Sequence, residues 1–232
     1  MKMASCRIFL TLNVYSVNIS MESETVPLAK PAPTVRRTKS SRSHLPLRDQ
    51  IRDTARDLFA REGYESVSMR RIGAQIGCSP MAIYRHYENK EELLLSICEE
   101  TFSRMIQLLD ETRKKPGTSL EKLRRCMRTI VDFHLSHPNH YKVTFMMLMP
   151  PGPVAERKVA IAQRAMDRLR AGVRECAAEK GMDVDVEIAA QIIRVATHGL
   201  ASALITTSRC YPWKDPERMK DELIAKVTRQ FE

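Results

Sequence analysis

The chain has 232 residues and a formal net charge of +10, with 38 Lys and Arg against 28 Asp and Glu. This length suffices for one large or two small domains with a hydrophobic core. The positive charge favours a polyanionic partner such as nucleic acid. The six cysteines lie far apart without a Cys-x-x-Cys pair, which is typical of reduced thiols in the cytoplasm rather than of a disulfide framework. A redox role for Cys78 or Cys98 remains an alternative.

Residues 1–45 are expected to form a disordered tail. Residues 1–20 contain a short apolar run that is broken by polar residues and is too short to span a membrane. Initiation at Met21 is an equally good interpretation. Residues 21–45 are rich in Pro, Ser and Thr, a composition that cannot form a core. Their end is a basic arm that would either contact DNA or merely keep the chain soluble; its residues are Arg36, Arg37, Lys39 and Arg42.

The first predicted helix covers about residues 47–61, because its apolar residues Ile51, Ala55, Leu58 and Phe59 form one stripe. The next two helices are short and nearly contiguous. One runs from Met69 to Ile76, and the other begins at Pro80 and runs to about Tyr87. Gly77 suits a left-handed helix end, Ser79 suits a helix cap and Pro80 suits the first helical position. Such a close stop and restart predicts a helix-turn-helix unit.

The second short helix has an outer face that suits a DNA groove better than solvent. Ile83 and Tyr87 would point inward. The remaining residues can donate hydrogen bonds to phosphates or bases, or contact a thymine methyl group; they are Met81, Ala82, Tyr84, Arg85 and His86. From residue 36 to residue 90 there are twelve Lys or Arg against six Asp or Glu, so much of the positive charge lies in this part of the chain.

These residues resemble the DNA-binding signature of the TetR family of bacterial transcriptional regulators. The positions that match are Ser68, Arg70, Ile72, Gly77, Ser79, Ala82, Ile83, Tyr84, His86, Tyr87, Lys90 and Leu93. Gly73, Cys78 and Tyr87 replace the usual Ala, Val and Phe. Nothing in the sequence explains Gly73, which costs a helix about 1 kcal/mol relative to Ala.

The resemblance implies a role for each of nine side chains. It implies contacts with the DNA backbone by Ser68, Arg70, Tyr84, His86 and Lys90. It also implies that Pro80, Met81, Ala82 and Arg85 face the bases. Without the resemblance, a surface helical hairpin with no role in DNA binding would be a competing interpretation.

The rest of the chain predicts further helices, so the fold class is all-α: an N-terminal helix-turn-helix domain over residues 46–92 and a helical domain over residues 93–232. A helix capped by Asn89 should run from Lys90 to about Thr112, and in the family this helix links the two domains. Further helices are expected over about 119–136, 140–149, 154–180, 184–207 and 216–231.

The last two predicted helices indicate a homodimer. The helix over about 184–207 has one apolar stripe at Ile188, Ile192 and Val195, and a second at Ile193 and Leu200. A helix that is apolar on two sides needs two partners, and one of them would be a second subunit. Met219, Leu223 and Val227 give the last helix a matching stripe, so the dimer interface would contain two helices from each subunit, as the TetR resemblance also implies. The segments HLSHPNHYKVTFMM and ATHGLASAL additionally resemble the WHG-type C-terminal domain of some TetR-type regulators, although Thr197 stands where Trp would be.

The C-terminal domain is expected to bind a small, largely apolar effector. From family architecture and apolarity, its pocket would be bounded by Phe102, Phe133, Tyr141, Phe145 and His198. His198 would otherwise be a core residue with one hydrogen bond. The spacing of His134, His137 and His140 suggests a metal site, but Pro138 breaks the helix between them and His137 at a helix end is the preferred interpretation. No metal or cofactor is therefore predicted.

The sequence has no Gly-rich phosphate loop, no Gly-x-Ser-x-Gly motif and no paired carboxylates in a defined context, so no catalytic residues are predicted. The expected function is a TetR-like regulator, in particular a repressor that a small apolar effector releases from a palindromic operator. Its partners would be double-stranded DNA, a second subunit and the effector, without a membrane. The alternative is an all-α enzyme, or a small-molecule- or metal-binding protein, whose basic charge is incidental.

Overall fold

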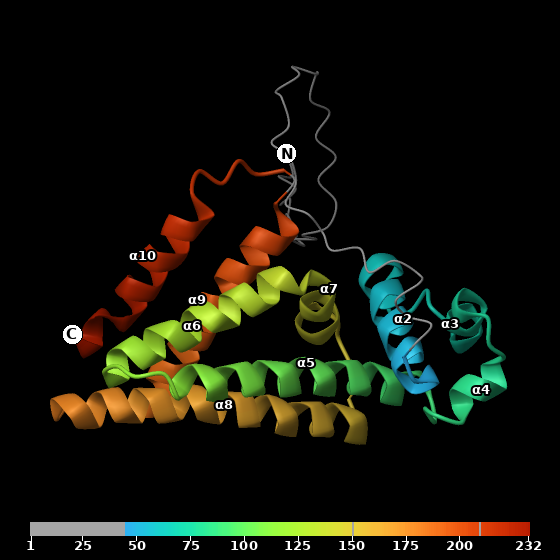
Figure 1. The fold of residues 1–232 in the computed structure, drawn as a ribbon, viewed down its shortest axis with the longest axis horizontal. Coiled ribbons are helices and arrows are strands. Elements are labelled where there is room, and N and C mark those ends of the chain that lie inside the picture. The colour runs from blue at the N-terminus through green and yellow to red at the C-terminus, as the bar shows by residue number, and fades with distance from the viewer. Residues whose placement is uncertain (1–44, 150, 209) are drawn as a thin grey trace, which may run out of the picture. The chain divides into compact units, whose positions relative to one another are not determined.

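The computed structural model describes residues 45–149, 151–208 and 210–232, all within one compact unit, Lys39–Glu232. The predictions for residues 1–44, including the basic arm, lie outside the described residues. Among the described residues every regular element is helical and there is no strand, which confirms the all-α fold (Figure 1). The α-helices are α2 (Leu47–Glu62), α3 (Met69–Ile76), α4 (Pro80–Tyr84), α5 (Lys90–Arg113), α6 (Ser119–Ser136), α7 (Pro138–Tyr141), α8 (Pro153–Lys180), α9 (Val186–Thr206) and α10 (Pro216–Thr228).

Side-chain caps explain where most of these helices begin. The side-chain oxygens of Ser68, Ser79 and Asn89 accept hydrogen bonds from backbone N–H groups in the first turns of α3, α4 and α5. Thr118 and Glu121 form a reciprocal capping box at the start of α6. Each cap satisfies a donor that the helix itself leaves free, so these starts follow from local sequence.

Three predicted helices differ in the structure. The helix expected from Pro80 to Tyr87 ends at Tyr84, although Ile83 and Tyr87 are buried as predicted. The helix expected near residues 140–149 is instead the four-residue α7 followed by a π-helical turn, Lys142–Met146. Such π turns are rare and often occur at functional positions. The last helix also ends early, at Thr228, and continues as a 3₁₀ turn, Arg229–Phe231.

The first four helices enclose an apolar cluster, here called the N-terminal cluster. Its buried residues come from α2, α3, α4, the loops between them and the first turns of α5, together with one residue of the π turn. They are Ile51, Ala55, Leu58, Phe59, Val67, Met69, Ile72, Ile83, Tyr87, Leu93, Leu94, Ile97 and Val143. This cluster fixes the orientation of α3 and α4.

The remaining helices enclose a second cluster, here called the C-terminal cluster. Its buried residues are Phe102, Met105, Leu109, Leu123, Cys126, Met127, Ile130, Phe133, Ala165, Leu169, Val173, Cys176, Ala189, Ala190, Ile193, Ile224 and Phe231. Because α5 contributes to both clusters, it joins the two parts of the core. The predicted division between residues 92 and 93 stays a prediction.

Helix α5 lies beside α8, and the two helices run in the same direction (Figure 1). Arg157 near the start of α8 forms an ion pair with Glu92, with 2.7 Å between Nη1 and Oε1. Further along, Arg168 pairs with Asp110, with 3.1 Å between Nη2 and Oδ2. These contacts hold α8 against the helix that joins the two clusters.

Helix α9 has one buried face and one exposed apolar face, as predicted. Ile193 is fully buried, whereas Ile188, Ile192 and Val195 are 52%, 49% and 66% exposed. By length and composition α9 could also cross a membrane, and it is the one helix among the described residues of which this holds. Core helices of globular proteins meet the same criterion, so this feature alone is weak support for a membrane span.

Candidate functional site

Helices α3 and α4 form a crossed pair that is joined by a tight turn. Gly77 has φ 77° and ψ 28°, the left-handed conformation that glycine adopts at low cost. Gly73 is explained by packing: a Cβ atom at this position would lie 2.7 Å from the carbonyl O of Cys78. The backbone N–H of Cys78 in turn donates to the carbonyl O of Gly73 at 3.0 Å. The absence of a side chain at residue 73 therefore allows this close approach.

The outer face of α4 is open to solvent and largely free of acidic residues. Met81 is 66% exposed and Tyr84 is 50% exposed. Pro80, Arg85 and His86 are also exposed, and Ala82 is half-buried. The structure thus brings the predicted base-facing residues together on one short helix and the turn that follows it.

Three other predicted DNA-contacting residues lie at helix starts. Ser68 is exposed and accepts a hydrogen bond from the backbone N–H of Arg71 at 3.1 Å, so its hydroxyl hydrogen stays free to donate. Arg70 is exposed on α3. Lys90, half-buried at the start of α5, donates from Nζ to the carbonyl O of Tyr64 at 3.0 Å and lies 4.0 Å from the centroid of that ring. Lys90 is therefore positioned by Tyr64.

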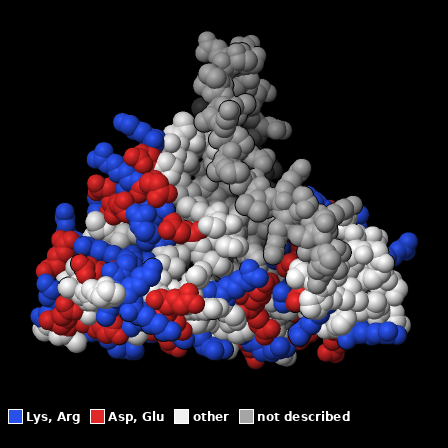
Figure 2. All heavy atoms as spheres, in the orientation of Figure 1, with Lys and Arg blue, Asp and Glu red and all other residues white. Residues whose placement is uncertain are grey.

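Most arginines of α2 are already neutralised within the protein. Arg52 pairs with Glu100 at 2.8 Å, Arg56 with Asp53 at 2.8 Å and Arg61 with Glu62 at 2.7 Å. By contrast, Arg70 and Arg85 have no ion-pair partner among the described residues. On the face shown in Figure 2, Lys and Arg also lie beside Asp and Glu over α6, α8 and α10, so those helices carry mixed charge. Uncompensated positive charge thus remains on α3 and just after α4.

A small cavity of about 60 Å³ lies between α5, α6, α8, α9 and the π turn. Its lining is mostly apolar and comprises Phe102, Met105, Leu109, Ile130, His134, Phe145, Ala162, Ala165, Met166, Leu169, Arg194, Thr197 and His198. Three of the five residues predicted for an effector pocket are among them, namely Phe102, Phe145 and His198. The other two, Phe133 and Tyr141, do not line the cavity.

All five predicted pocket residues nevertheless belong to one group of aromatic rings around His134. The His134 ring lies edge-on to the rings of Tyr141 and Phe145, with 4.9 Å between centroids in both cases. Phe145 also contacts Phe102, at 5.5 Å between centroids. The hydroxyl of Tyr141 lies 3.1 Å from Nδ1 of His198. Phe133 and Tyr141 both contact the lining residue His134 without lining the cavity themselves.

The sequence did not indicate the other ten lining residues. Six of them lie at helical spacing on α5 and α8, as in Ala162, Ala165, Met166 and Leu169, so a helical-face comparison could have suggested these six. Which faces meet is decided by contacts between helices that are far apart in the chain.

The three histidines with regular spacing have separate roles and do not converge on a metal. His137 ends α6, and its Nδ1 lies 3.0 Å from the carbonyl O of Phe133. His134 lines the cavity, and His140 contacts α2 and α5. Within the described residues no group of three or more His, Cys, Asp and Glu could hold a metal ion.

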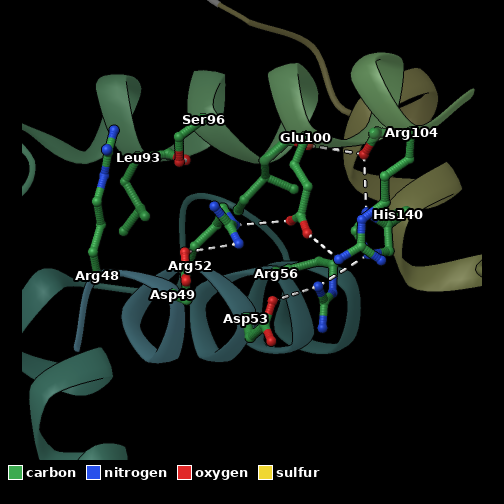
Figure 3. Close-up of polar contacts among 12 residues, drawn as sticks. Arg48, Asp49, Arg52, Asp53, Arg56, Leu93, Ser96, Glu100, Arg104 and His140 are labelled. Carbon is green, nitrogen blue, oxygen red and sulfur yellow. Dashed lines mark hydrogen bonds and ion pairs between the residues drawn. The ribbon is translucent and has the colours of Figure 1, made fainter. Parts of the chain in front are cut away.

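His140 bridges α2, α5 and α7 (Figure 3). Arg56 can only donate, and its Nη1 lies 3.0 Å from Nε2 of His140, so Nε2 accepts and the ring proton lies on Nδ1. Nδ1 then donates to Oγ1 of Thr101 at 2.9 Å, and Thr101 donates to the carbonyl O of Ile97 at 2.8 Å. Burial, together with the charges of Arg56 and Arg104, lowers the pKa of His140 to about 2, consistent with this neutral ring.

The segment from α7 through the π turn connects the cavity with the N-terminal cluster. Phe145 lines the cavity, whereas Val143 is fully buried in the N-terminal cluster. Between them, Oγ1 of Thr144 donates to Oγ1 of Thr101 at 3.1 Å. His140 at the other end of the segment contacts Arg56 of α2. A change in the position of this segment would therefore alter contacts on both sides.

The two cysteines considered as an alternative for a redox role lie in surroundings that do not favour the thiolate. Burial raises the pKa of Cys78 and of Cys98, which disfavours the reactive thiolate. Cys78, Cys98, Cys126, Cys176 and Cys210 are all free thiols in the structure.

Two family descriptions match separate parts of the chain. Residues 51–97 match "Bacterial regulatory proteins, tetR family", and residues 123–227 match "Tetracyclin repressor-like, C-terminal domain". The WHG-type subfamily stays a prediction. The fatty acid metabolism regulator protein of Bacillus subtilis is 34% identical over 74 residues, which are 32% of this chain and 38% of that protein. The matched segment therefore spans little more than a third of that relative.

Solved structures establish the fold over most of the chain. The transcriptional regulator FadR from Bacillus subtilis, in complex with stearoyl-CoA, is 20% identical with a TM-score of 0.69, covering 77% of this chain and 96% of that one. AibR, in complex with isovaleryl coenzyme A and operator DNA, is 20% identical with a TM-score of 0.64 over 77% and 96% of the two chains.

Proposed function

We propose that this chain, which belongs to the TetR family of bacterial regulatory proteins, acts as a homodimeric transcriptional repressor that binds double-stranded DNA. The observation that carries this proposal is the exposed outer face of α4, held by a buried Ile83 and lacking the acidic residues that a solvated helix usually carries. Relatives of the chain are named as regulators rather than enzymes, and the proposal needs no catalytic step. Action of this kind takes place in the cytoplasm.

The proposed reading helix combines two kinds of contact. Pro80, Met81, Ala82 and Arg85 would face base edges in the major groove, where an arginine pairs well with guanine. Tyr84 and His86 would contact the backbone together with Ser68, Arg70 and Lys90. Backbone contacts set the position of the protein on DNA, and base contacts set the sequence preference.

The second subunit would cover the exposed apolar face of α9. Ile188, Ile192 and Val195 are each about half exposed or more, and a continuous apolar stripe of this kind marks an interaction surface. The predicted contribution of α10 is smaller, because Met219 and Leu223 are half-buried against Val131, Leu200 and Leu204 of the same subunit. Two-fold symmetry would place two copies of α4 on successive major grooves of an inverted repeat.

The proposed effector site is the cavity lined by Phe102, Phe145 and His198. Its volume of about 60 Å³ is far below the roughly 300–1,000 Å³ of ordinary ligand pockets, so an effector must displace the surrounding side chains. FadR and AibR were solved with acyl-CoA esters. Acyl-CoA thioesters are therefore the first class of effector to test on this chain, with the acyl group as the part that enters the cavity.

The effector would act through the segment that runs from α7 through the π turn. Displacement of Phe145 would move Val143 and Thr144, and with them the contact between His140 and Arg56. A ligand can only shift the balance between two forms by its difference in affinity for them, so a few kcal/mol of preference for the non-binding form is required.

The proposal is tested by recovery of sheared genomic DNA of the source organism with the purified protein. Wild-type protein should concentrate on a small number of loci, whereas an Arg85→Ala variant should lose that preference while it still binds DNA. Recovery of fragments in proportion to their input by the wild-type protein would contradict a sequence-specific regulator. The matched control is Arg61→Ala, an exposed arginine of α2 that pairs with its neighbour Glu62.

A further inference from the structure

His134 is a buried polar side chain with an unsatisfied ring nitrogen. The residue is 3% exposed, and its Nδ1 has no hydrogen-bond partner among the described residues. Buried polar atoms of this kind are uncommon, and each one calls for a specific explanation such as a bound partner. His134 is also one of the residues that line the cavity.

The neighbouring polar side chains, including Arg194 in the cavity lining, do not supply the missing partner. The ring of His198 pairs with the hydroxyl of Tyr141, and the ring of His137 pairs with the carbonyl O of Phe133. Thr197, which also lines the cavity, donates to the carbonyl O of Ile193 at 2.9 Å. The rings of Tyr141 and Phe145 pack edge-on against His134 and hold it in place. The ring of His134 is thus held beside the cavity, and its Nδ1 is left without a hydrogen-bond partner.

The charge of this ring narrows the choice of partner. Burial, with smaller contributions from His198 and His137, lowers the pKa of His134 to about 4, so the ring is neutral at neutral pH. A neutral imidazole offers one N–H donor and one acceptor, and it is matched by a neutral group such as a hydroxyl or a carbonyl. The rest of the lining is mostly Phe, Met, Leu, Ile and Ala side chains, which suit an apolar body, and its other polar residues are Thr197, His198 and the charged Arg194.

We propose that the effector is not a pure hydrocarbon in its buried part, but presents one neutral hydroxyl or carbonyl group to His134. This inference rests on the proposed role of the cavity as the effector site. A site with a buried polar group discriminates strongly against an analogue that leaves this group unpaired. His134 is therefore the residue of the cavity that sets the chemical class of the ligand.

Phenol and toluene test this inference, because they have nearly the same shape and differ in a hydroxyl against a methyl group. Their dissociation constants for the full chain are measured by calorimetry in a sealed cell. Wild-type protein should bind phenol at least about tenfold more tightly, although toluene is the more hydrophobic compound. In His134→Phe this preference should disappear or reverse. In His134→Gln, which keeps a donor and an acceptor, it should persist.

His137→Phe is the matched control, because His137 lies on the same helix end, does not line the cavity and should leave the preference unchanged. Equal or tighter binding of toluene by the wild-type protein would overturn the inference, as would binding of neither compound or an unchanged preference in His134→Phe. Should His134→Phe fail to fold, the inference is tested by the preference for phenol over toluene in the wild-type protein and in His134→Gln.

DNA selectivity measured on the same preparations separates this inference from the proposed function. Sequence-selective DNA binding together with no preference for phenol overturns the role of His134 and leaves the regulator intact. Absence of sequence-selective DNA binding by the wild-type protein refutes the proposed function, whichever ligand the cavity prefers.

Discussion

The contact between Arg56 and His140 is expected to stabilise the fold and to connect its two clusters. His140→Phe keeps the size of the ring but removes the acceptor for Arg56 and the donor to Thr101. A hydrogen bond to a charged group contributes about 1.5–3 kcal/mol, and Arg56 keeps its ion pair with Asp53. We therefore expect a loss of about 2 kcal/mol in the free energy of unfolding. For a chain of this size that corresponds to a decrease in Tm of about 4–8 °C.

A double-mutant cycle isolates this contact from other effects of the substitutions. Arg56→Met also leaves Asp53 without its partner, but this cost occurs in both the single and the double variant and cancels in the cycle. Urea unfolding of the wild type, Arg56→Met, His140→Phe and the double variant, at one protein concentration, should give a coupling of about 1–2 kcal/mol. The same cycle with His137→Phe should give none. A coupling below about 0.5 kcal/mol for Arg56 and His140 would refute the proposed connection.

Three further predictions concern pH, DNA binding and assembly. In the folded chain the pKa values of His134 and His140 are about 4 and about 2, below the ordinary histidine value of about 6.5. Between the folded and the unfolded pKa of each histidine, only the unfolded chain binds the proton. The free energy of unfolding therefore decreases as the pH falls below about 6.5. At pH 5.5 each of the two histidines should lower the free energy of unfolding by about 1.4 kcal/mol. In urea unfolding, His134→Phe or His140→Phe should therefore show a smaller decrease in this free energy between pH 7.5 and 5.5 than the wild type. An equal decrease would contradict the burial of neutral rings. Arg70→Gln should weaken binding to all DNA sequences and reduce the slope of log K against log salt by about 1.8 for a dimer. Arg85→Ala should instead reduce the binding free energy by about 1–3 kcal/mol on the preferred bases only. Equal loss on specific and random duplexes would count against base reading by Arg85. Val195→Glu should convert the dimer to a monomer in light scattering, and an unchanged mass would place the interface elsewhere.

The sequence predicts helix starts well, because capping is local. The bounds of α3 and α6 agree to the residue with the prediction, and Ser79 and Asn89 cap the helices that they were expected to cap. Gly77 likewise has the left-handed conformation that its position suggested. All of these features depend on residues within one turn of each other.

The predictions that failed depend on contacts between distant residues. Helix α4 ends at Tyr84, and the hydroxyl of Tyr87 instead donates to the carbonyl O of Arg48, 39 residues earlier, at 3.2 Å. The π turn after α7 is tied to α5 by Thr144. None of these partners is visible from local sequence.

The effector pocket was also predicted only in part, because some of its lining depends on contacts between distant residues. The aromatic residues Phe102, Phe145 and His198 were selected from resemblance and apolarity, and they do line a cavity. The lining residues of α8 were missed, because the packing of α8 on α5 involves residues far apart in the chain, as in the ion pair of Arg168 with Asp110 across 58 positions. The bridge from Arg56 to His140 spans 84 positions and was missed for the same reason.

The central claim is that two copies of α4 in one symmetric dimer read a specific DNA sequence, and selection of bound duplexes from a random pool tests it most directly. The selection should enrich an inverted repeat whose half-site centres lie about one helical turn, or a multiple of it, apart. The same selection with Arg85→Ala should relax the preference at the same position of both half-sites. Salt-sensitive binding without any enriched sequence would contradict the account and leave a basic helical protein with some other role.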